Sequence, residues 1–312
     1  MVLNFCRDLK NSIREHFQTV NDKPVRHMLN SLQRDRFERL NSHIRIDVEE
    51  MCILLQTQFS DLVEPGTDHC IDETIIQYCG DDTAVVYIPE KPHPEGFLCW
   101  TDVNHFQSQI PYLLNFKLRH KKKKYSTVDV FGSVMSKRRE DYSLAVADSW
   151  FPSYDLLDYC QFECIDYLFA FPKTRYQYLW RAIGHKIDME HCKQAYRPVT
   201  NEVAVVFKTI KPIRLMSNHF TVDFKGKIPK IPVVKKQYDV HSHWGDTFNI
   251  FFYKYSWPHR CRNRHNAIFH GLLRFAVVNA FSIFRTLHND DLLTFAQFVE
   301  QLSDEILQYQ FS

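Results

Sequence analysis

Apolar positions in the first part of the chain recur near the spacing of an α-helix. They form two groups, one at Leu3, Phe5, Leu9, Ile13 and Phe17 and a second at Met28, Leu29, Leu32, Phe37 and Leu40. This periodicity is typical of helices that bury one face. The Pro65–Gly66 pair then breaks the pattern, as these residues do between elements. The sequence therefore predicts a helical region over residues 1–67.

From residue 68 onward the pattern changes to short apolar runs of the kind that form buried strands. The clearest runs are TAVVYI at 83–88 and SLAVAD at 143–148, with VAVVF at 203–207 further on. Runs of this length, bounded by turn residues, indicate strands. Lys and Pro are frequent around the third run. We expect an α/β core whose first part is 68–173, followed by a β-rich insertion at 174–232.

The C-terminal part of the chain returns to helical spacing. Residues 267–287 are apolar almost all round and long enough to raise the question of a membrane span. Four polar residues interrupt them, namely His270, Arg274, Asn279 and Arg285. These favour a buried core helix and no membrane partner. We expect 233–255 to complete the core and 256–312, with an amphipathic helix at 292–307, to pack with 1–67.

Composition narrows the classes of function. The 312 residues are 45% hydrophobic, enough for a sizeable core. Only 8 are Gly, and no glycine-rich phosphate loop is present, so we expect no nucleotide cofactor. The 9 Cys form no C-x-x-C pair, and the chain does not begin with a secretory signal. This usage predicts reduced thiols in a nuclear or cytosolic protein.

The net charge is only +2, but basic residues are grouped. One group runs from Lys117 to Arg139, a second from Lys225 to Lys236 and a third from Lys254 to Arg264. Candidate DNA contacts in them are Lys121, Lys122, Lys123, Lys124, Lys137, Arg138, Arg139, Arg260, Arg262 and Arg264. Such groups can neutralise phosphates. A solvated loop and a nuclear localisation signal at the four lysines remain open alternatives.

Two acids stand where chemistry is expected. Asp72 lies in the apolar run CIDETII beside Glu73, and two adjacent carboxylates are costly to bury without a cation or partner. Asp148 closes the strand SLAVAD, and Pro152 and Ser153 after it indicate a helix start. An acid at the carboxyl end of a buried strand faces the crevice where α/β sheets bind ligands. Each acid alone is equally consistent with a helix cap or a salt bridge.

Five segments in chain order resemble the piggyBac transposase family. CIDETIIQYCG with YIPEKPHPEG keeps the family's Asp-Glu segment and the Tyr-x-Pro-x-Lys-Pro turn that follows it. VADSWFPSYDLL keeps the family's Asp-x-aromatic-aromatic-x-Ser segment. YDVHSHWGD keeps Tyr238 and Asp246 of another family segment. RDRFERL at 34–40 and VVNAFSIF at 277–284 resemble helices on either side of the catalytic domain. Together the matches span roughly residues 30 to 305.

The resemblance implies a ribonuclease H-like catalytic core, split by the insertion and flanked by helical segments. It implies that Asp72, Asp148 and Asp246 bind two Mg²⁺ or Mn²⁺ ions, which suit hard oxygen ligands. Two such ions can support phosphoryl displacement in double-stranded DNA cleavage and strand transfer. It further implies a homodimer, with residues 1–67 in dimerisation or DNA binding, a nuclear location, and Lys91 at the DNA.

Several positions depart from the family pattern. Ser149 replaces an Asn, and Asn249 stands where the family has a further acid, one helical turn after Asp246. We expect Asn249 to offer a metal its amide oxygen but no charge. No cysteine-rich module follows in these 312 residues. A catalytically impaired, domesticated DNA-binding or interaction protein is therefore the main alternative to an active transposase.

A second enzyme class remains open at the same segment. His241 and His243 form an H-x-H string, which at a strand end directs both imidazoles to one side and can bind zinc, as in barrel metallohydrolases. This hypothesis requires residues 239–243 to be a strand. His265 and His270, with Cys261, are more simply explained as basic-loop and core-helix residues.

Overall fold

A computed structural model describes most of the chain from residue 45 onward. The described stretches are 45–105, 110–119, 124–135, 143–172, 174–176, 192–208, 212–220, 231–254, 261–288 and 293–311, with single residues and short pieces elsewhere. Most of the predicted helical region at 1–44 lies outside them. Within it, β1 (Thr19–Val20) and β2 (Lys23–Pro24) form an antiparallel pair between the two apolar groups.

One large sheet organises the described part of the chain, and it holds nine strands. They are β3 (Asp68–Gln77), β4 (Val85–Tyr87), β5 (Glu95–Asn104), β6 (Tyr112–Leu118), β7 (Leu144–Ala147), β8 (Asp166–Ala170), β9 (Cys192–Arg197), β10 (Glu202–Lys208) and β11 (Pro212–Ser217). Their order is β4-β5-β3-β7-β8-β11-β10-β9, and β6 pairs with β5 beside β4. The sheet is therefore mixed rather than uniformly parallel.

The strand directions divide this sheet into three zones. β3, β7 and β8 are parallel to one another, whereas β5 runs antiparallel to β3. On the other side, β11, β10 and β9 continue the sheet from β8 by antiparallel pairing. The parallel strands lie in the middle, where both faces are covered. This places β3 and β7 at the centre of the sheet.

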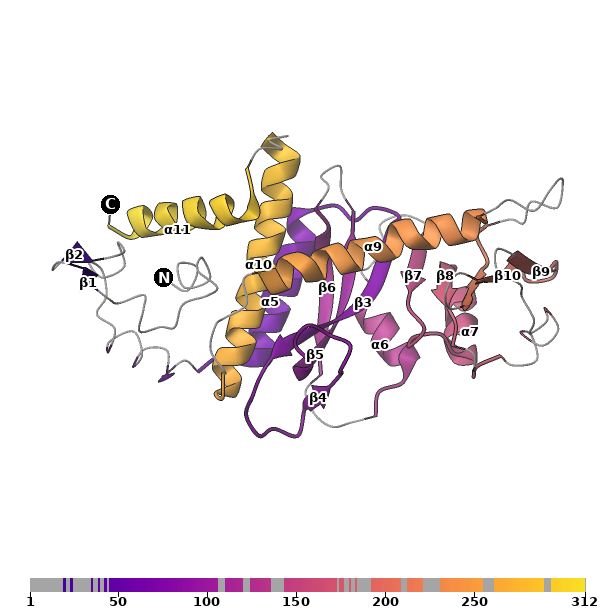
Figure 1. Ribbon diagram of the computed structural model, residues 1–312, viewed down its shortest axis with the longest axis horizontal. Coiled ribbons are helices and arrows are strands. Elements are labelled where there is room, and N and C mark those ends of the chain that lie inside the picture. Colours follow the sequence, from indigo (N-terminus) through magenta and orange to yellow (C-terminus); the bar gives the residue numbers. More distant parts are fainter. Residues whose placement is uncertain are drawn as a thin grey trace.

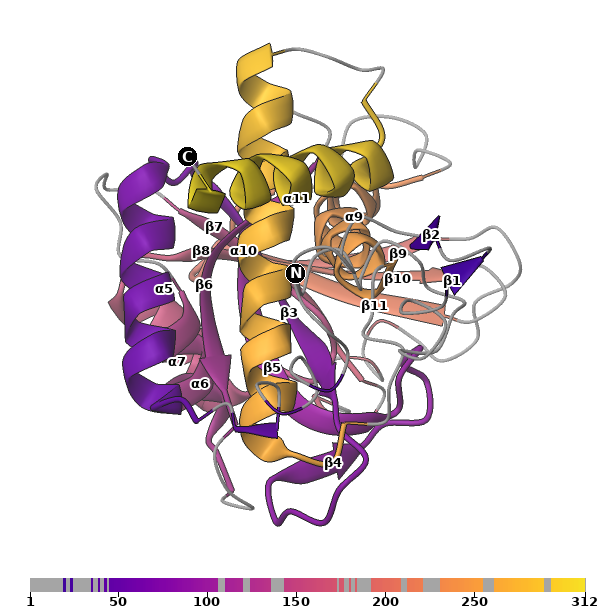
Figure 2. The same cartoon turned by 90° about the vertical axis from the view of Figure 1, so that its left-hand side faces the viewer.

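Helices cover both faces of the sheet (Figures 1 and 2). They are α5 (Val48–Leu62), α6 (Thr127–Val134), α7 (Tyr154–Phe162), α9 (Val233–Lys254), α10 (Arg264–His288) and α11 (Phe295–Phe311). α5, α9 and α10 share a hydrophobic core with one face, and α6 and α7 share another core with the opposite face. α9 runs obliquely across the strands, and α11 extends away from the sheet.

The burial pattern of β3 explains how one strand serves both cores. Cys70 and Ile76 belong to the core under α9 and α10, whereas Ile71 and Ile75 belong to the core with α6 and α7. Alternate residues of a strand point to opposite faces, so both sets must be apolar in a central strand. Asp72 lies in the first set by this alternation. Its carboxylate therefore points toward α9.

α10 confirms the expected core helix. It is the helix in the described part of the chain whose length and composition would allow a membrane span, and 61% of its apolar window is buried within the protein. Its polar residues bond to the sheet. The amide of Asn279 both donates to and accepts from the backbone of Leu113, each at 2.8 Å, and Ser282 donates to the carbonyl of Ile110.

Short polar residues begin the two helices that cover the face of the sheet opposite α9. Ser153 accepts from the backbone N–H of Leu156 and caps α7, as the sequence predicts. Ser126 does the same for α6 through Asp129. Such caps typically contribute about 1 kcal/mol. They fix where each helix starts after its strand, and so they position the loop after β7.

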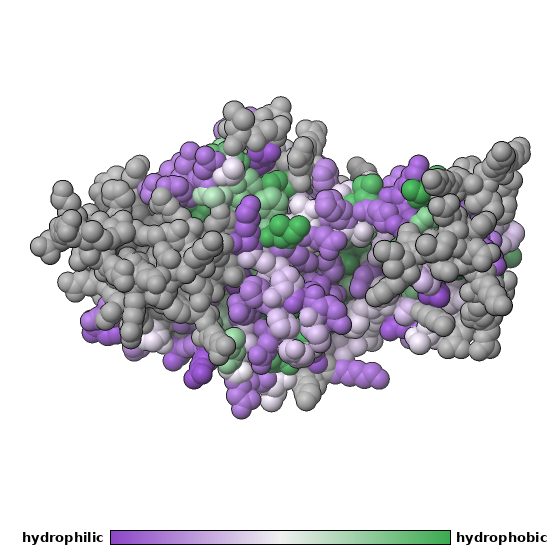
Figure 3. Space-filling view, in the orientation of Figure 1, coloured by the Kyte–Doolittle hydropathy of each residue, from purple (hydrophilic) through white to green (hydrophobic). Residues whose placement is uncertain are grey.

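The segment predicted to be a β-rich insertion contains β9, β10 and β11. All three lengthen the main sheet, and Val203 and Val205 of β10 share a small core with Leu144, Val146 and the start of α9. The division of the chain into five parts at the predicted boundaries stays a prediction. On the face shown in Figure 3, hydrophilic residues predominate and hydrophobic ones form smaller groups among them.

Candidate carboxylate site

Two of the predicted acids lie at neighbouring positions on adjacent parallel strands. Asp72 lies within β3, and Asp148 directly follows β7, its parallel neighbour. Ile71 pairs with Ala147, the last residue of β7, so the next residue on each strand faces the same side. Both carboxylates are partly buried. The pairing of the two strands thus brings together acids that are far apart in sequence.

The third predicted acid comes from α9, which crosses above these strands. Asp246 is exposed on this helix, directly after Gly245. A Cβ at Gly245 would lie 2.9 Å from Asp72 Oδ2 and 3.1 Å from Cys70 Sγ. Only a residue without a side chain lets the helix approach β3 so closely. Gly245 therefore sets the distance between the strand that carries Asp72 and the helix that carries Asp246.

Asp72 has polar partners on both sides. The amide nitrogen of Asn249 donates to its Oδ2 at 3.0 Å, and the Lys91 ammonium lies 3.9 Å from its Oδ1. Lys91 also pairs with Glu73 at 3.1 Å and donates to the Glu73 carbonyl. The Asn249 oxygen accepts from Thr74 at 2.6 Å. In this arrangement Asn249 directs its amide hydrogens to Asp72, whereas a metal ligand would present the oxygen.

Burial and nearby negative charges disfavour the ionised forms of Asp72 and Asp148. The pKa of Asp72 is raised to about 7, first by burial, then by Glu73 and Asp148, while Lys91 opposes the shift. The pKa of Asp148 is raised to about 6, again by burial first and then by Glu73. Although burial alone would lower it, the pKa of Lys91 is raised by Asp72 and Glu73. The site thus has a surplus of negative charge that favours a cation.

Tyr238 links the three acids. Burial raises the pKa of its phenol, and the negative charges of Asp148, Asp72 and Asp246 raise it further. A phenol that feels all three carboxylates must lie within electrostatic reach of each. Tyr238 belongs to α9, two turns before Asp246. Asp72, Asp148 and Asp246 are therefore all within electrostatic reach of this one phenol.

The donor set suits a hard divalent cation, although the side chains are not closed around one point. Carboxylate oxygens are the ligands that Mg²⁺ and Mn²⁺ prefer. In the described part of the chain, no three His, Cys, Asp or Glu side chains are arranged to hold a metal ion. Asn249 and Lys91 engage Asp72 instead, and Asp246 is exposed.

Comparison with known proteins is informative at the level of structure. A search of family models matches nothing, and a search of curated proteins matches nothing. Among solved structures, the chain is similar to a piggyBac transposase synaptic complex with hairpin DNA, with a TM-score of 0.72 and 16% identity over 96% of this chain and 68% of that one. The chain has a piggyBac-like fold. This confirms the predicted α/β, ribonuclease H-like class.

The helical conformation of residues 239–243 excludes the zinc-hydrolase hypothesis. These residues belong to α9, whereas the hypothesis required a strand. Two residues along a helix differ by about 200°, so the two imidazoles point apart. His241 bonds to Asp68 at 3.0 Å, and the exposed His243 contacts Thr247. Helical register therefore separates side chains that a strand would have aligned.

The predicted DNA contacts divide into three groups. Lys91 and Arg264 are engaged in the fold, since Lys91 faces the acids and Arg264 pairs with Asp82 at 2.6 Å. Lys124 and Arg262 are exposed. The others lie outside the described residues, namely Lys121, Lys122, Lys123, Lys137, Arg138, Arg139 and Arg260. Their contact with DNA stays a prediction.

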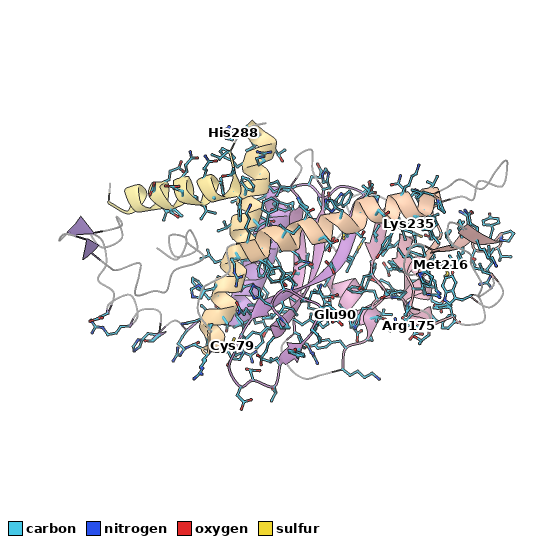
Figure 4. The ribbon with its side chains drawn as sticks, in the orientation of Figure 1. Cys79, Glu90, Arg175, Met216, Lys235 and His288 are labelled. Carbon is cyan, nitrogen blue, oxygen red and sulfur yellow. The ribbon has the colours of Figure 1, made fainter. Side chains whose placement is uncertain are left out.

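Three contributors to this site are not evident from the sequence. In the sequence, Gly245 is only one residue of the YDVHSHWGD segment, with no sign that it contacts Asp72. Lys91 is predicted only as a candidate DNA contact. Arg175 has no motif around it, yet its guanidinium donates to the carbonyls of Trp150 and Pro152, and its charge opposes the rise in the pKa of Asp148. In Figure 4 Arg175 lies at the lower margin of the sheet. A lone Arg at a distance from the acid in sequence carries no local signal.

Proposed function

We propose that this chain is the core of a piggyBac-type DNA transposase, in which Asp72, Asp148 and Asp246 bind two divalent metal ions for DNA cleavage and strand transfer. The observation that carries the proposal is geometric: the pairing of β3 with β7 sets Asp72 beside Asp148, and Gly245, next to Asp246 on α9, packs directly against Asp72. One acid within a central strand, one directly after its neighbour and one on a crossing helix thus come from three elements that meet. Without a bound cation, such crowding has no structural benefit.

The residues have distinct tasks in this proposal. Mg²⁺ or Mn²⁺ bound there would supply a more acidic water and stabilise the displaced oxygen of a phosphodiester. Asp72 and Asp148 sit on the rigid centre of the sheet and fix the position of the site. Asp246 is on α9 and exposed, so it joins them from the solvent side. Lys91 balances the charge before metal arrives, and Asn249 orients Asp72.

Double-stranded DNA is the proposed partner, and the neighbour of known structure is a complex with hairpin DNA. Exposed Lys124 and Arg262 lie in two of the basic groups of the sequence. Replacing Lys121 to Lys124 with Gln should flatten the salt dependence of DNA binding, because each lysine at a phosphate releases about 0.9 counterion. A homodimer in the nucleus completes the proposal.

Cleavage of labelled hairpin and duplex DNA in Mg²⁺, Mn²⁺ or EDTA tests this function. We expect metal-dependent nicking by the wild type and none by Asp72→Asn, Asp148→Asn or Asp246→Asn. Asp61→Asn is the matched control, because Asp61 is an exposed acid on α5, which packs on another part of the sheet. Titration calorimetry should show weaker metal binding in the three site variants alone. Equal metal affinity in Asp148→Asn and wild type would refute the assignment.

A domesticated, non-cleaving DNA-binding protein is the second candidate. The observation in its favour is Asn249, which gives Asp72 a hydrogen bond where the family has another acid. In Asn249→Asp the new carboxylate would face Asp72, so we expect stronger metal binding and lower stability without metal. DNA binding without cleavage in wild type, together with cleavage in Asn249→Asp, would establish the domesticated state.

A further inference from the structure

Trp150 is an exposed aromatic ring beside the carboxylate site. It follows Asp148 by two positions, and its backbone N–H donates to Asp148 Oδ1 at 2.9 Å. Its side chain remains 38% exposed, although it is large and hydrophobic. Exposed large apolar groups of this kind are informative when they adjoin a site. The fold therefore keeps a Trp in contact with solvent at the point where a substrate would enter.

The ring of Trp150 is held in place from several sides. Trp100, only 2% exposed, stacks on it with ring centroids 5.7 Å apart and planes 29° from parallel. Tyr125 meets the edge of Trp100, and buried Phe151 meets Trp150 edge-on. Arg175 fixes the backbone by donating to the Trp150 carbonyl at 3.0 Å. The platform is thus preorganised, which lowers the entropic cost of binding.

A flat, fixed and solvent-exposed aromatic face suits a nucleobase. Base–aromatic stacking contributes to the binding of single strands whatever the base, because every base has a π-face. A base inside a duplex is already stacked on its neighbours, so only an unpaired base can reach Trp150. Arg175 adds a positive charge beside the platform, and its charge reaches Asp148. That charge favours an adjoining phosphate.

The charges of α7 limit how far a strand could follow. Asp155 and Asp158 are exposed on this helix and repel a phosphate backbone. The favourable surface therefore covers Trp150 and Arg175 and ends where α7 begins.

We infer that Trp150, with Arg175 beside it, is a stacking site for one unpaired nucleobase of a DNA strand whose phosphate lies at Asp72 and Asp148. The inference rests on the proposed function for the position of that phosphate. It adds a positioning residue for an unpaired nucleotide next to the reacting phosphate. Trp150 is a positioning residue in this scheme, and it takes no part in the phosphoryl transfer.

Binding in EDTA tests the site without any metal-dependent step. The probes are a fluorescein-labelled hairpin with an unpaired loop and a fully paired duplex of the same stem. We expect Trp150→Ala to weaken hairpin binding by roughly 10-fold and to leave duplex binding unchanged. Trp150→Phe should retain most of the hairpin affinity because it keeps a ring. Phe162→Ala is the control, since Phe162 is an 83% exposed aromatic at the end of α7.

Tryptophan fluorescence gives a readout that a purely structural role would not change. The hairpin should quench part of the emission of the 5 tryptophans in wild type, and that part should vanish in Trp150→Phe. Equal loss of hairpin and duplex binding in Trp150→Ala, or unchanged quenching in Trp150→Phe, would overturn the inference. Absent cleavage with intact Trp150-dependent binding would instead refute the proposed function alone. Cleavage without any effect of Trp150 would refute the inference alone.

Discussion

Two groups of acids lie on or beside β3, and they differ in how their charge is balanced. Near the start of β3 each acid has a histidine: Asp68 bonds to His241 at 3.0 Å, and buried Asp102 of the neighbouring β5 bonds to buried His69 of β3 at 3.0 Å. The hydrogen bond from His241 lowers the pKa of Asp68, although burial opposes it. In the middle of the strand, burial and neighbouring acids raise the pKa of Asp72.

Some acids of this region stabilise the folded state, and others destabilise it when no metal is bound. A buried acid with a fixed partner contributes to a unique structure, and losing the partner leaves an uncompensated charge. An acid whose pKa is raised by burial and by other acids lowers the stability of the metal-free protein at physiological pH. A raised carboxylate pKa at the centre of a sheet identifies a candidate functional site. The same strand therefore carries a structural end and, in its middle, the proposed functional site.

The largest expected effect comes from breaking the structural pair. His69→Ala leaves Asp102 buried without its histidine, which should lower the free energy of unfolding by about 3 kcal/mol or more. Urea denaturation followed by circular dichroism measures it. His243→Ala, on the exposed side of α9, should change little. A loss in His69→Ala no larger than that of the control would mean that the pair does not support the fold.

The next largest loss of stability is expected from a substitution at Gly245, where α9 packs tightly against β3. Gly245→Ala would force a Cβ to within 2.9 Å of Asp72 Oδ2 and 3.1 Å of Asp72 Cβ, so the helix or the strand must shift. We expect a loss of about 1–3 kcal/mol in stability. In Gly132→Ala on α6, the new Cβ would meet the end of the Tyr159 side chain at 2.9 Å, which can swing away. Thermal denaturation of both variants should therefore separate them clearly.

Much of the fold could be predicted because its signals are local. The apolar run at 143–148 became β7, the run at 203–207 lies within β10, and Ser153 caps α7 as expected. The polar residues of α10 indicated a core helix, and one of them, Asn279, bonds to the backbone of β6. Burial periodicity and capping depend on neighbours in sequence, so a single chain reveals them.

The candidate site was only partly predictable because its geometry depends on contacts between distant segments. The motif resemblance indicated Asp72 and Asp148, and the parallel register of β3 and β7 brings them together. The H-x-H hypothesis was wrong, because alternation looks the same whether or not the segment is a strand. Lys91 is a candidate DNA contact by sequence, although it pairs with Glu73 from another part of the sheet. No local pattern shows which side chain a cation will meet.

The functional middle of β3 should respond in the opposite direction to the structural end. Because the folded pKa of Asp72, about 7, exceeds an unfolded value of about 3.9, the folded state holds more protons between these pH values. Metal-free stability should therefore fall as pH rises through that range. Asp72→Asn removes this effect, and we expect a gain of about 1 kcal/mol at neutral pH. Calorimetry at several pH values in EDTA measures this difference. An Asp72→Asn protein less stable than wild type at every pH would contradict the prediction.

The smallest effect, and the sharpest contrast with Asp72, belongs to Asp68. Its pKa is lowered in the folded state, so its contribution to stability is fully present above the unfolded pKa of about 3.9. That contribution is lost as pH falls through the lower folded pKa. Since the side chain is 36% exposed, solvent screens the pair with His241, and we expect Asp68→Asn to cost less than about 1 kcal/mol at neutral pH. Melting temperatures of wild type and Asp68→Asn should converge in acid, whereas those of wild type and Asp72→Asn should diverge toward neutral pH. Parallel pH profiles for the two variants would show that the acids of β3 do not fall into two classes, and the division between its structural end and its functional middle would be lost.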